Sequence, residues 1–163
     1  NAAYSERQQK YAQVFKLNSI YTPQVIVNGK REMVGSNESR LRNTIISFLQ
    51  NTNSASINVQ AKNTAGKTVT VDYKTDQSAG KVLNIALVEL HAVTNVKRGE
   101  NEGRTLQHSN IVRDFKTVIA DNGNGKILLQ LPEDITAKDC KIICYLQDLK
   151  SLEIKAATEA MIE

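Results

Sequence analysis

Residues 20–35, IYTPQVIVNGKREMVG, contain a proline, a short apolar run and an Asn-Gly pair in the order that a β-hairpin requires. The apolar run VIV at 25–27 predicts a short buried strand. Asn28 and Gly29 follow it directly, and this dipeptide favours the tight turn that joins two antiparallel strands. The segment therefore predicts two paired strands, the second of which begins near Met33.

A helix is expected on each side of this hairpin. The first is predicted over residues 5–16, because a capping-box pattern precedes apolar side chains on one face (Ser5 and Gln8; Tyr11, Val14 and Phe15). The second begins at a cap, Ser36 or Asn37, and its apolar positions recur at helical spacing (Leu41, Ile45, Phe48 and Leu49). The polar stretch NTNSAS at 51–56 then predicts a linker. Residues 1–50 thus have the predicted order helix, strand, strand, helix.

Beyond the linker the apolar residues alternate with polar ones, which is typical of half-buried strands. The alternating sets are Ile57, Val59 and Ala61; Val69, Val71 and Tyr73; Ile127, Leu129 and Leu131; Leu152, Ile154 and Ala156. Longer apolar runs at 82–93 and 140–147 predict central strands, and turn signals such as NTAGK and DNGNGK separate the segments. Residues 57–163 are therefore predicted to form an antiparallel β-sandwich without a helix, and the fold class is α+β.

The composition excludes some classes of function. The apolar fraction of 40% and the charged fraction of 23% are typical of folded globular proteins. The net charge of +4 comes from basic residues scattered among acidic ones, so nucleic acid is not an expected partner. No apolar stretch reaches the ~20 residues of a membrane span, and the opening NAAYSERQQKY does not have the pattern of a signal peptide.

The two cysteines, Cys140 and Cys144, lie in the β-branched run DCKIICYLQD, which predicts a strand. Both should face the same side of that strand, with Ile142 and Leu146. Four residues of strand span roughly 13 Å, whereas a disulfide needs Cα atoms within about 7 Å, so these two thiols cannot bridge to each other. We interpret them as small buried apolar side chains and expect no metal site, no cofactor and no catalytic residue in this chain.

Pro23 stands immediately before the predicted strand, and two interpretations are open. It can be an ordinary trans proline at the start of an edge strand. Alternatively, the order of elements resembles the C-terminal half of thioredoxin, in which a Thr-Pro bond before a strand is cis. This resemblance implies that Thr22, Pro23 and Gln24 form a cis-proline loop, with the backbone of Thr22 free to pair with an extended substrate. Proline is the residue for which a cis bond costs only ~0.5–1 kcal/mol.

The segment KRGENEGRTLQHSNIVRDF at 97–115 is the least generic stretch of the second half. Its candidate residues are Arg98, Glu100, Asn101, Arg104, His108, Asn110 and Arg113. Three interpretations compete: a structural network of Arg–Glu pairs that holds a hairpin, a recognition site in which Arg98 and Arg104 bind a carboxylate or phosphate, and a catalytic site with His108 as a general base oriented by Glu100. Strand alternation predicts His108 and Asn110 on one face and Arg113 on the other.

Together, YTPQVIVNG and RGENEGRTLQHSNIVR resemble the two signature segments of a bacterial family of secreted, thioredoxin-like proteins, domain of unknown function 1223. The resemblance implies a periplasmic or secreted location, a CxxC-bearing first half of a thioredoxin fold, and a sandwich signature formed by Arg98 to Asn101 with Arg104, His108 and Arg113. The departure is that this sequence holds no CxxC pair.

The resemblance implies an extracytoplasmic thioredoxin-like protein that exchanges thiols and disulfides when intact, although this chain has no redox centre. Its partner would be an unidentified protein or thiol substrate. The alternative is a non-enzymatic binding or assembly module that uses the charged hairpin at 97–115.

Overall fold

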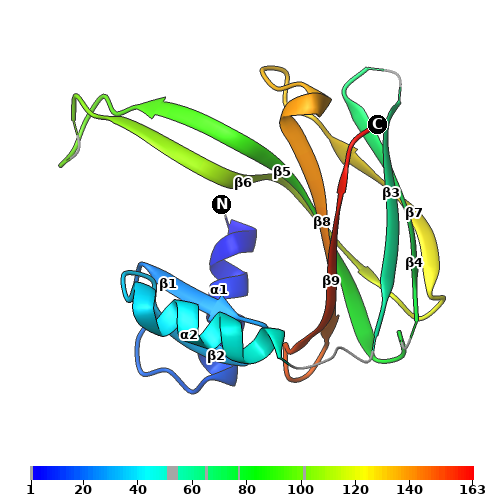
Figure 1. The fold of residues 1–163 in the computed structure, drawn as a ribbon, viewed down its shortest axis with the longest axis horizontal. Helices are drawn as coiled ribbons and strands as arrows, with labels where there is room; N and C mark the ends of the chain where they lie inside the picture. Colours follow the sequence, from blue (N-terminus) through cyan, green and yellow to red (C-terminus); the bar gives the residue numbers. More distant parts are fainter. Residues whose placement is uncertain (1, 51–54, 65, 77, 101) are drawn as a thin grey trace.

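The computed structural model describes residues 2–50, 55–64, 66–76, 78–100 and 102–163. Two helices and two short strands come first, and seven longer strands follow (Figure 1). The elements are α1 (Ala2–Val14), β1 (Gln24–Val27), β2 (Arg31–Val34), α2 (Glu38–Leu49), β3 (Ile57–Thr64), β4 (Thr68–Thr75), β5 (Lys81–Asn95), β6 (Thr105–Ile119), β7 (Asn124–Gln130), a 3-10 helix (Ala137–Asp139), β8 (Cys140–Asp148) and β9 (Ile154–Met161). The α+β class is confirmed.

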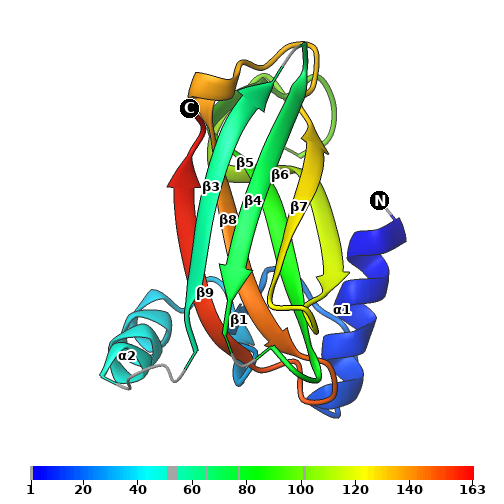
Figure 2. The same cartoon turned by 90° about the vertical axis from the view of Figure 1, so that its right-hand side faces the viewer.

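The strands form three antiparallel sheets. β1 pairs with β2; a three-stranded sheet has the order β3-β4-β7; and a four-stranded sheet has the order β6-β5-β8-β9. The two larger sheets face each other (Figure 2) and enclose the hydrophobic core. Alternation decides which side chains enter it: Val69 and Val71 of β4 meet Leu83, Ile85 and Leu87 of β5, and all five are fully buried. The expectation that this half contains no helix is wrong only at the 3-10 turn before β8.

Both cysteines lie in β8 and point into this core with Ile142 and Leu146, as the alternation predicts. Their thiols are free and completely buried. Burial raises the pKa of Cys144 to about 12, because a thiolate loses its hydration inside the core. Burial also raises the pKa of Cys140, with a smaller contribution from the charge of Glu89.

The first fifty residues form the expected helix, hairpin and helix, with shifted boundaries: α1 ends at Val14, before the predicted residue 16, and β2 begins at Arg31, before Met33. Asn28 and Gly29 have φ values of 51° and 67°, as a tight hairpin turn requires. Asn37 caps α2 by accepting a hydrogen bond from the Arg40 amide at 3.0 Å. The predicted start of the first helix at Ser5 is wrong, because α1 already begins at Ala2 and contains Ser5 within its first turns. Alanine has the highest helix propensity, which favours the earlier start.

The hairpin turn docks on the loop between β8 and β9. The Ile154 amide donates a hydrogen bond of 2.9 Å to the Asn28 carbonyl, and Lys30 forms an ion pair with Glu153. A Cβ built on Gly29 would lie 2.8 Å from the Leu152 carbonyl carbon, so the two backbones are in direct contact there. The turn of the hairpin is therefore fixed against the larger sheets.

The β5–β6 hairpin extends well beyond the other strands of its sheet (Figure 1). We call its distal part the arm, which comprises residues 89–95, 105–111 and the described residues of the connecting turn. The burial of β5 changes along its length, from fully buried at 83–88 to mostly exposed at 91–95. The pairing of β5 with β6 shifts by one residue at the base of the arm, where Leu87 pairs with Asp114 but Val88 pairs with Val112. Arg113 is consequently the bulged residue.

Candidate functional site

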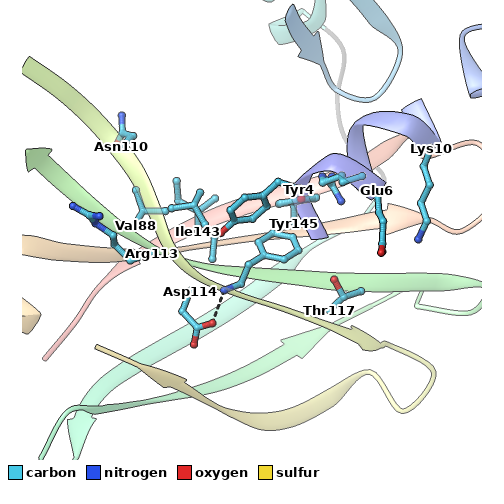
Figure 3. A pocket seen from close by; sticks show the side chains of 14 residues that line it. Tyr4, Glu6, Lys10, Val88, Asn110, Arg113, Asp114, Thr117, Ile143 and Tyr145 are labelled. Atoms are coloured by element: carbon cyan, nitrogen blue, oxygen red, sulfur yellow. Dashed lines mark hydrogen bonds between the residues drawn. The ribbon is translucent and has the colours of Figure 1, made fainter. Parts of the chain in front are cut away.

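A cavity of about 620 Å³ lies between α1 and the outer face of the four-stranded sheet (Figure 3). Ala86 and Val88 belong to its floor, because they alternate with the β5 residues that enter the core. Helix α1 supplies the opposite wall, with Tyr4, Arg7 and Lys10 among its lining residues. The volume falls within the range of small-molecule sites.

Arg7 lies among three aromatic rings at one side of this cavity. Its guanidinium carbon is 5.2 Å from the ring centroid of Tyr11, 5.6 Å from that of Phe115 and 5.5 Å from that of Tyr145. Its Nη2 donates to the Tyr11 hydroxyl at 3.2 Å and to Gln147 Oε1 at 3.4 Å. These contacts stabilise the cation by the ring quadrupoles and by neutral acceptors.

A buried row of polar side chains connects α1 with the sheet. Gln147 Nε2 donates to the Tyr11 hydroxyl and to the Leu152 carbonyl, both at 2.7 Å. Asn84 Nδ2 donates to Gln147 Oε1 at 3.1 Å, and Thr117 Oγ1 donates to Asn84 Oδ1 at 2.8 Å. Asn84 and Gln147 are only 1% and 2% exposed, so every polar atom they bring into the interior needs a partner. The row therefore fixes the position of α1 on the sheet.

The predicted proline loop lines a second cavity, of about 420 Å³, between the loop, α1 and the four-stranded sheet. Thr22 and Gln24 contribute to its wall, and it shares Tyr4, Arg7 and Tyr145 with the first cavity. The Thr22–Pro23 peptide bond is cis, and the Pro23 carbonyl accepts a hydrogen bond of 2.8 Å from the Gly35 amide. The loop and α1 thus border one recess.

Glu32 of β2 orders the side chains beside this loop. Its Oε2 accepts hydrogen bonds from the Tyr21 hydroxyl and, at 3.2 Å, from Gln24 Nε2. The hydrogen bond to Glu32 raises the pKa of the Tyr21 hydroxyl, since the carboxylate stabilises the protonated phenol. Gln24 is held by this bond next to the second cavity.

The charged residues of the 97–115 segment are divided between the tip and the base of the arm. Arg98, Glu100 and Arg104 are exposed at the tip, and Asn101 lies outside the described residues. Backbone bonds close the turn there, including Gly103 N to Val96 O at 2.9 Å. Within the described ranges, the tip shows no side-chain hydrogen bond or ion pair of the three charged residues, and His108 shows none either. The described residues of the tip therefore show no Arg–Glu pair, and the structural network at the tip stays a prediction.

At the base of the arm, Arg113 Nε donates to Glu89 Oε2 at 2.7 Å in an ion pair whose carboxylate is largely shielded from solvent and whose guanidinium is partly exposed. Asn110 has a positive φ of 57°, and it lines the first cavity together with Arg113. Glu89 pairs with Cys140 of the core, so it alternates with Val88 of the cavity floor. The bulge at Arg113 interrupts the alternation of β6, and the placement of Asn110 and Arg113 on opposite faces stays a prediction.

Sequence reasoning missed Arg7 and Tyr145, which line both cavities, and Phe115, which lines the first. A signal for this joint was present in Gln147, a long polar side chain in an otherwise apolar predicted strand. Such a residue must find partners when it is buried. One of its partners is Tyr11 of α1, which lies 136 positions earlier in the chain. Spacing within one strand does not reveal such a partner.

The comparisons with known proteins give one structure and one family. No curated protein matches the chain. A solved domain of the outer membrane lipoprotein Omp28 from Porphyromonas gingivalis is 14% identical, covers 69% of this chain and 91% of its own, and superposes with a TM-score of 0.44. The family described as "Protein of unknown function (DUF1223)" matches residues 1–147, and the chain therefore belongs to this family.

Proposed function

We propose that this chain is the non-catalytic portion of an extracytoplasmic, thioredoxin-like thiol–disulfide protein. Residues 1–50 would be the C-terminal half of a thioredoxin-like domain, residues 51–56 a linker and residues 57–163 a β-sandwich domain. The sequence resemblance supports the extracytoplasmic location. In this proposal Thr22, Pro23 and Gln24 form the loop beside which an extended thiol substrate would lie.

The observation that carries the proposal is the uncovered apolar surface of α2. The helix has no buried residue, and Ile45, Ile46 and Leu49 are 41%, 49% and 79% exposed. Among the side chains described up to residue 50, the buried apolar ones are Tyr11 and Met33. A helix with one apolar face normally packs that face against a sheet. The strands of a thioredoxin-like sheet would cover it.

This chain's own cysteines do not fit the redox chemistry. The thiolate is the nucleophile in disulfide exchange, and it must reach its target. Cys140 and Cys144 are inaccessible, and burial raises the pKa of both thiols. The exchanging pair would therefore have to be supplied by another part of the intact protein, with Thr22 and Gln24 positioning its substrate.

The test is the intact mass of the protein from its native source, measured with and without alkylation after reduction and denaturation. The proposal expects at least two alkylated thiols beyond Cys140 and Cys144, and it expects the additional pair to react before denaturation. A native protein with these two thiols alone would refute the redox role.

A second candidate is a binding module that uses the tip of the arm. Arg98 and Arg104 are exposed there, with no side-chain partner among the described residues. Arginine pairs readily with carboxylates and phosphates, so the tip could contact an anionic partner. Replacing both arginines with Ala should then abolish partner binding without changing the melting temperature.

A further inference from the structure

Arg7 is a half-buried cation whose donors are only partly used. A guanidinium carries five N–H donors. In the described part of the chain, its hydrogen bonds come from Nη2 alone, to Tyr11 and to Gln147, and it has no carboxylate partner. The two acceptors are neutral, so the positive charge is compensated only by the surrounding rings. Nε and Nη1 therefore remain able to bind an anion.

The two carboxylates that line the same cavity do not neutralise Arg7. Asp114 accepts backbone hydrogen bonds instead, from the Phe115 amide at 2.8 Å and from the Gln130 amide at 2.9 Å. Glu6 is exposed and forms no ion pair among the described residues. The other cations of the cavity are Arg113, which is paired with Glu89, and the exposed Lys10. Arg7 is thus the cation of this cavity that combines partial burial with unused donors.

The rest of the wall is suited to an apolar body. Ala86 and Val88, at 4% and 1% exposure, form part of the floor, and Ile143 continues it on β8. Figure 3 shows the side chains of Val88 and Ile143 next to each other on the sheet, with Tyr145 between them and α1. Apolar walls with a few placed polar groups are typical of small-molecule sites.

We propose that this cavity binds a small carboxylic acid with an aromatic or aliphatic body. The carboxylate accepts a hydrogen bond from Nε or from Nη1 of Arg7, and the body lies on the floor formed by β5 and β8. These two free donors point to different sides of the guanidinium, so each binds a single carboxylate oxygen, and the positive charge and partial burial of Arg7 strengthen the bond. This site uses no thiol and is independent of the redox proposal.

The experiment titrates 4-phenylbutyrate and its neutral analogue, 4-phenylbutyramide, into the full chain and follows binding by saturation-transfer NMR. The acid should bind at least about tenfold more tightly than the amide, since a hydrogen bond to a charged group is worth ~1.5–3 kcal/mol. Arg7→Gln should weaken binding of the acid by about tenfold or more and leave the affinity for the amide unchanged. Lys10→Gln is the matched control from the same helix and cavity, and it should change the affinity for the acid by less than about threefold.

A second variant keeps the test decisive if Arg7→Gln does not fold. Val112 is 39% exposed on the edge strand β6 and lines the cavity, so Val112→Phe should fill the site without removing Arg7 and should abolish binding of both compounds. The proposal is overturned if the native chain binds acid and amide equally, if it shows no saturable binding of the acid, or if Lys10→Gln weakens the acid as much as Arg7→Gln.

Discussion

Gly29→Ala should be the most damaging single methyl addition at the joint between the β1–β2 hairpin and the sandwich. Gly29 has a φ of +67°, and its added Cβ would overlap the Leu152 carbonyl oxygen and lie 3.0 Å from Glu153 Cα. Backbone atoms on both sides leave no flexible side chain that could move away. The hairpin turn must therefore leave the β8–β9 loop.

The expected loss of stability follows from three contributions. An L-residue in the left-handed region costs roughly 1–2 kcal/mol. Displacement of the turn also breaks the hydrogen bond from Ile154 to Asn28, worth about 1 kcal/mol, and the ion pair of Lys30 with Glu153, which is partly exposed and worth ~0–1 kcal/mol. The total is about 3 kcal/mol.

Gly80→Ala is the matched control, because Gly80 has a φ of +68° and a Cβ there would meet nothing within 4 Å. It carries the conformational cost alone, ~1–2 kcal/mol. Urea unfolding followed by circular dichroism should place Gly29→Ala about 1–2 kcal/mol below the control, or ~2–8 °C lower in melting temperature. Amide exchange at Ile154 should accelerate in Gly29→Ala only. Equal unfolding of the two variants would refute the proposed backbone contact.

The remaining predictions concern the polar row, the core thiols and the arm. Gln147→Leu leaves the buried Tyr11 hydroxyl without its 2.7 Å donor and should lower the free energy of unfolding by roughly 2–4 kcal/mol in urea titrations. A loss under about 1 kcal/mol would contradict the conclusion that the polar row fixes α1 on the sheet. Burial raises the pKa of Cys144 from 9.0 to about 12, so folding favours the protonated thiol. The stability that this thiol contributes is fully present below pH 9 and is lost as the pH rises toward 12. The urea midpoint should thus fall between about pH 8 and about pH 10.5, and fall less in Cys144→Ala. The double variant Arg98→Ala, Arg104→Ala should change the free energy of unfolding by less than ~0.5 kcal/mol. A large loss of stability would instead support the structural network at the tip.

The elements of the fold were predictable where local chemistry specifies them. Asn28 and Gly29 require a turn, and Asn37 is a strong helix cap, so both appear where the sequence places them. The alternation of apolar and polar residues likewise locates the sandwich strands, and the alternation within β8 gives the common face of Cys140 and Cys144. These features depend on residues within a few positions of one another, so the sequence pattern of a single element is enough to predict them.

The cavities were not predictable in the same way, because long-range pairing creates them. Arg7 is polar and lies on a helix without strong amphipathicity, so nothing local indicates that three rings surround it. The bulge at Arg113 depends on the pairing of β5 with β6 and has no glycine or proline to mark it. A shift of one residue changes the face of the side chains that follow it, so alternation counted from residues before the bulge does not predict which side chains beyond it line the cavity.

The joint between α1 and the sheet also explains why the two cavities should respond to each other. Arg7, Tyr4 and Tyr145 belong to both walls, and Arg7 is bound to Gln147, which in turn holds Tyr11. A carboxylate that draws the guanidinium toward the first cavity changes its contacts with the rings that also line the second cavity. Thr22 and Gln24 lie on that second wall. Arg7 is therefore the side chain through which a carboxylate in the first cavity would affect the wall that Thr22 and Gln24 line.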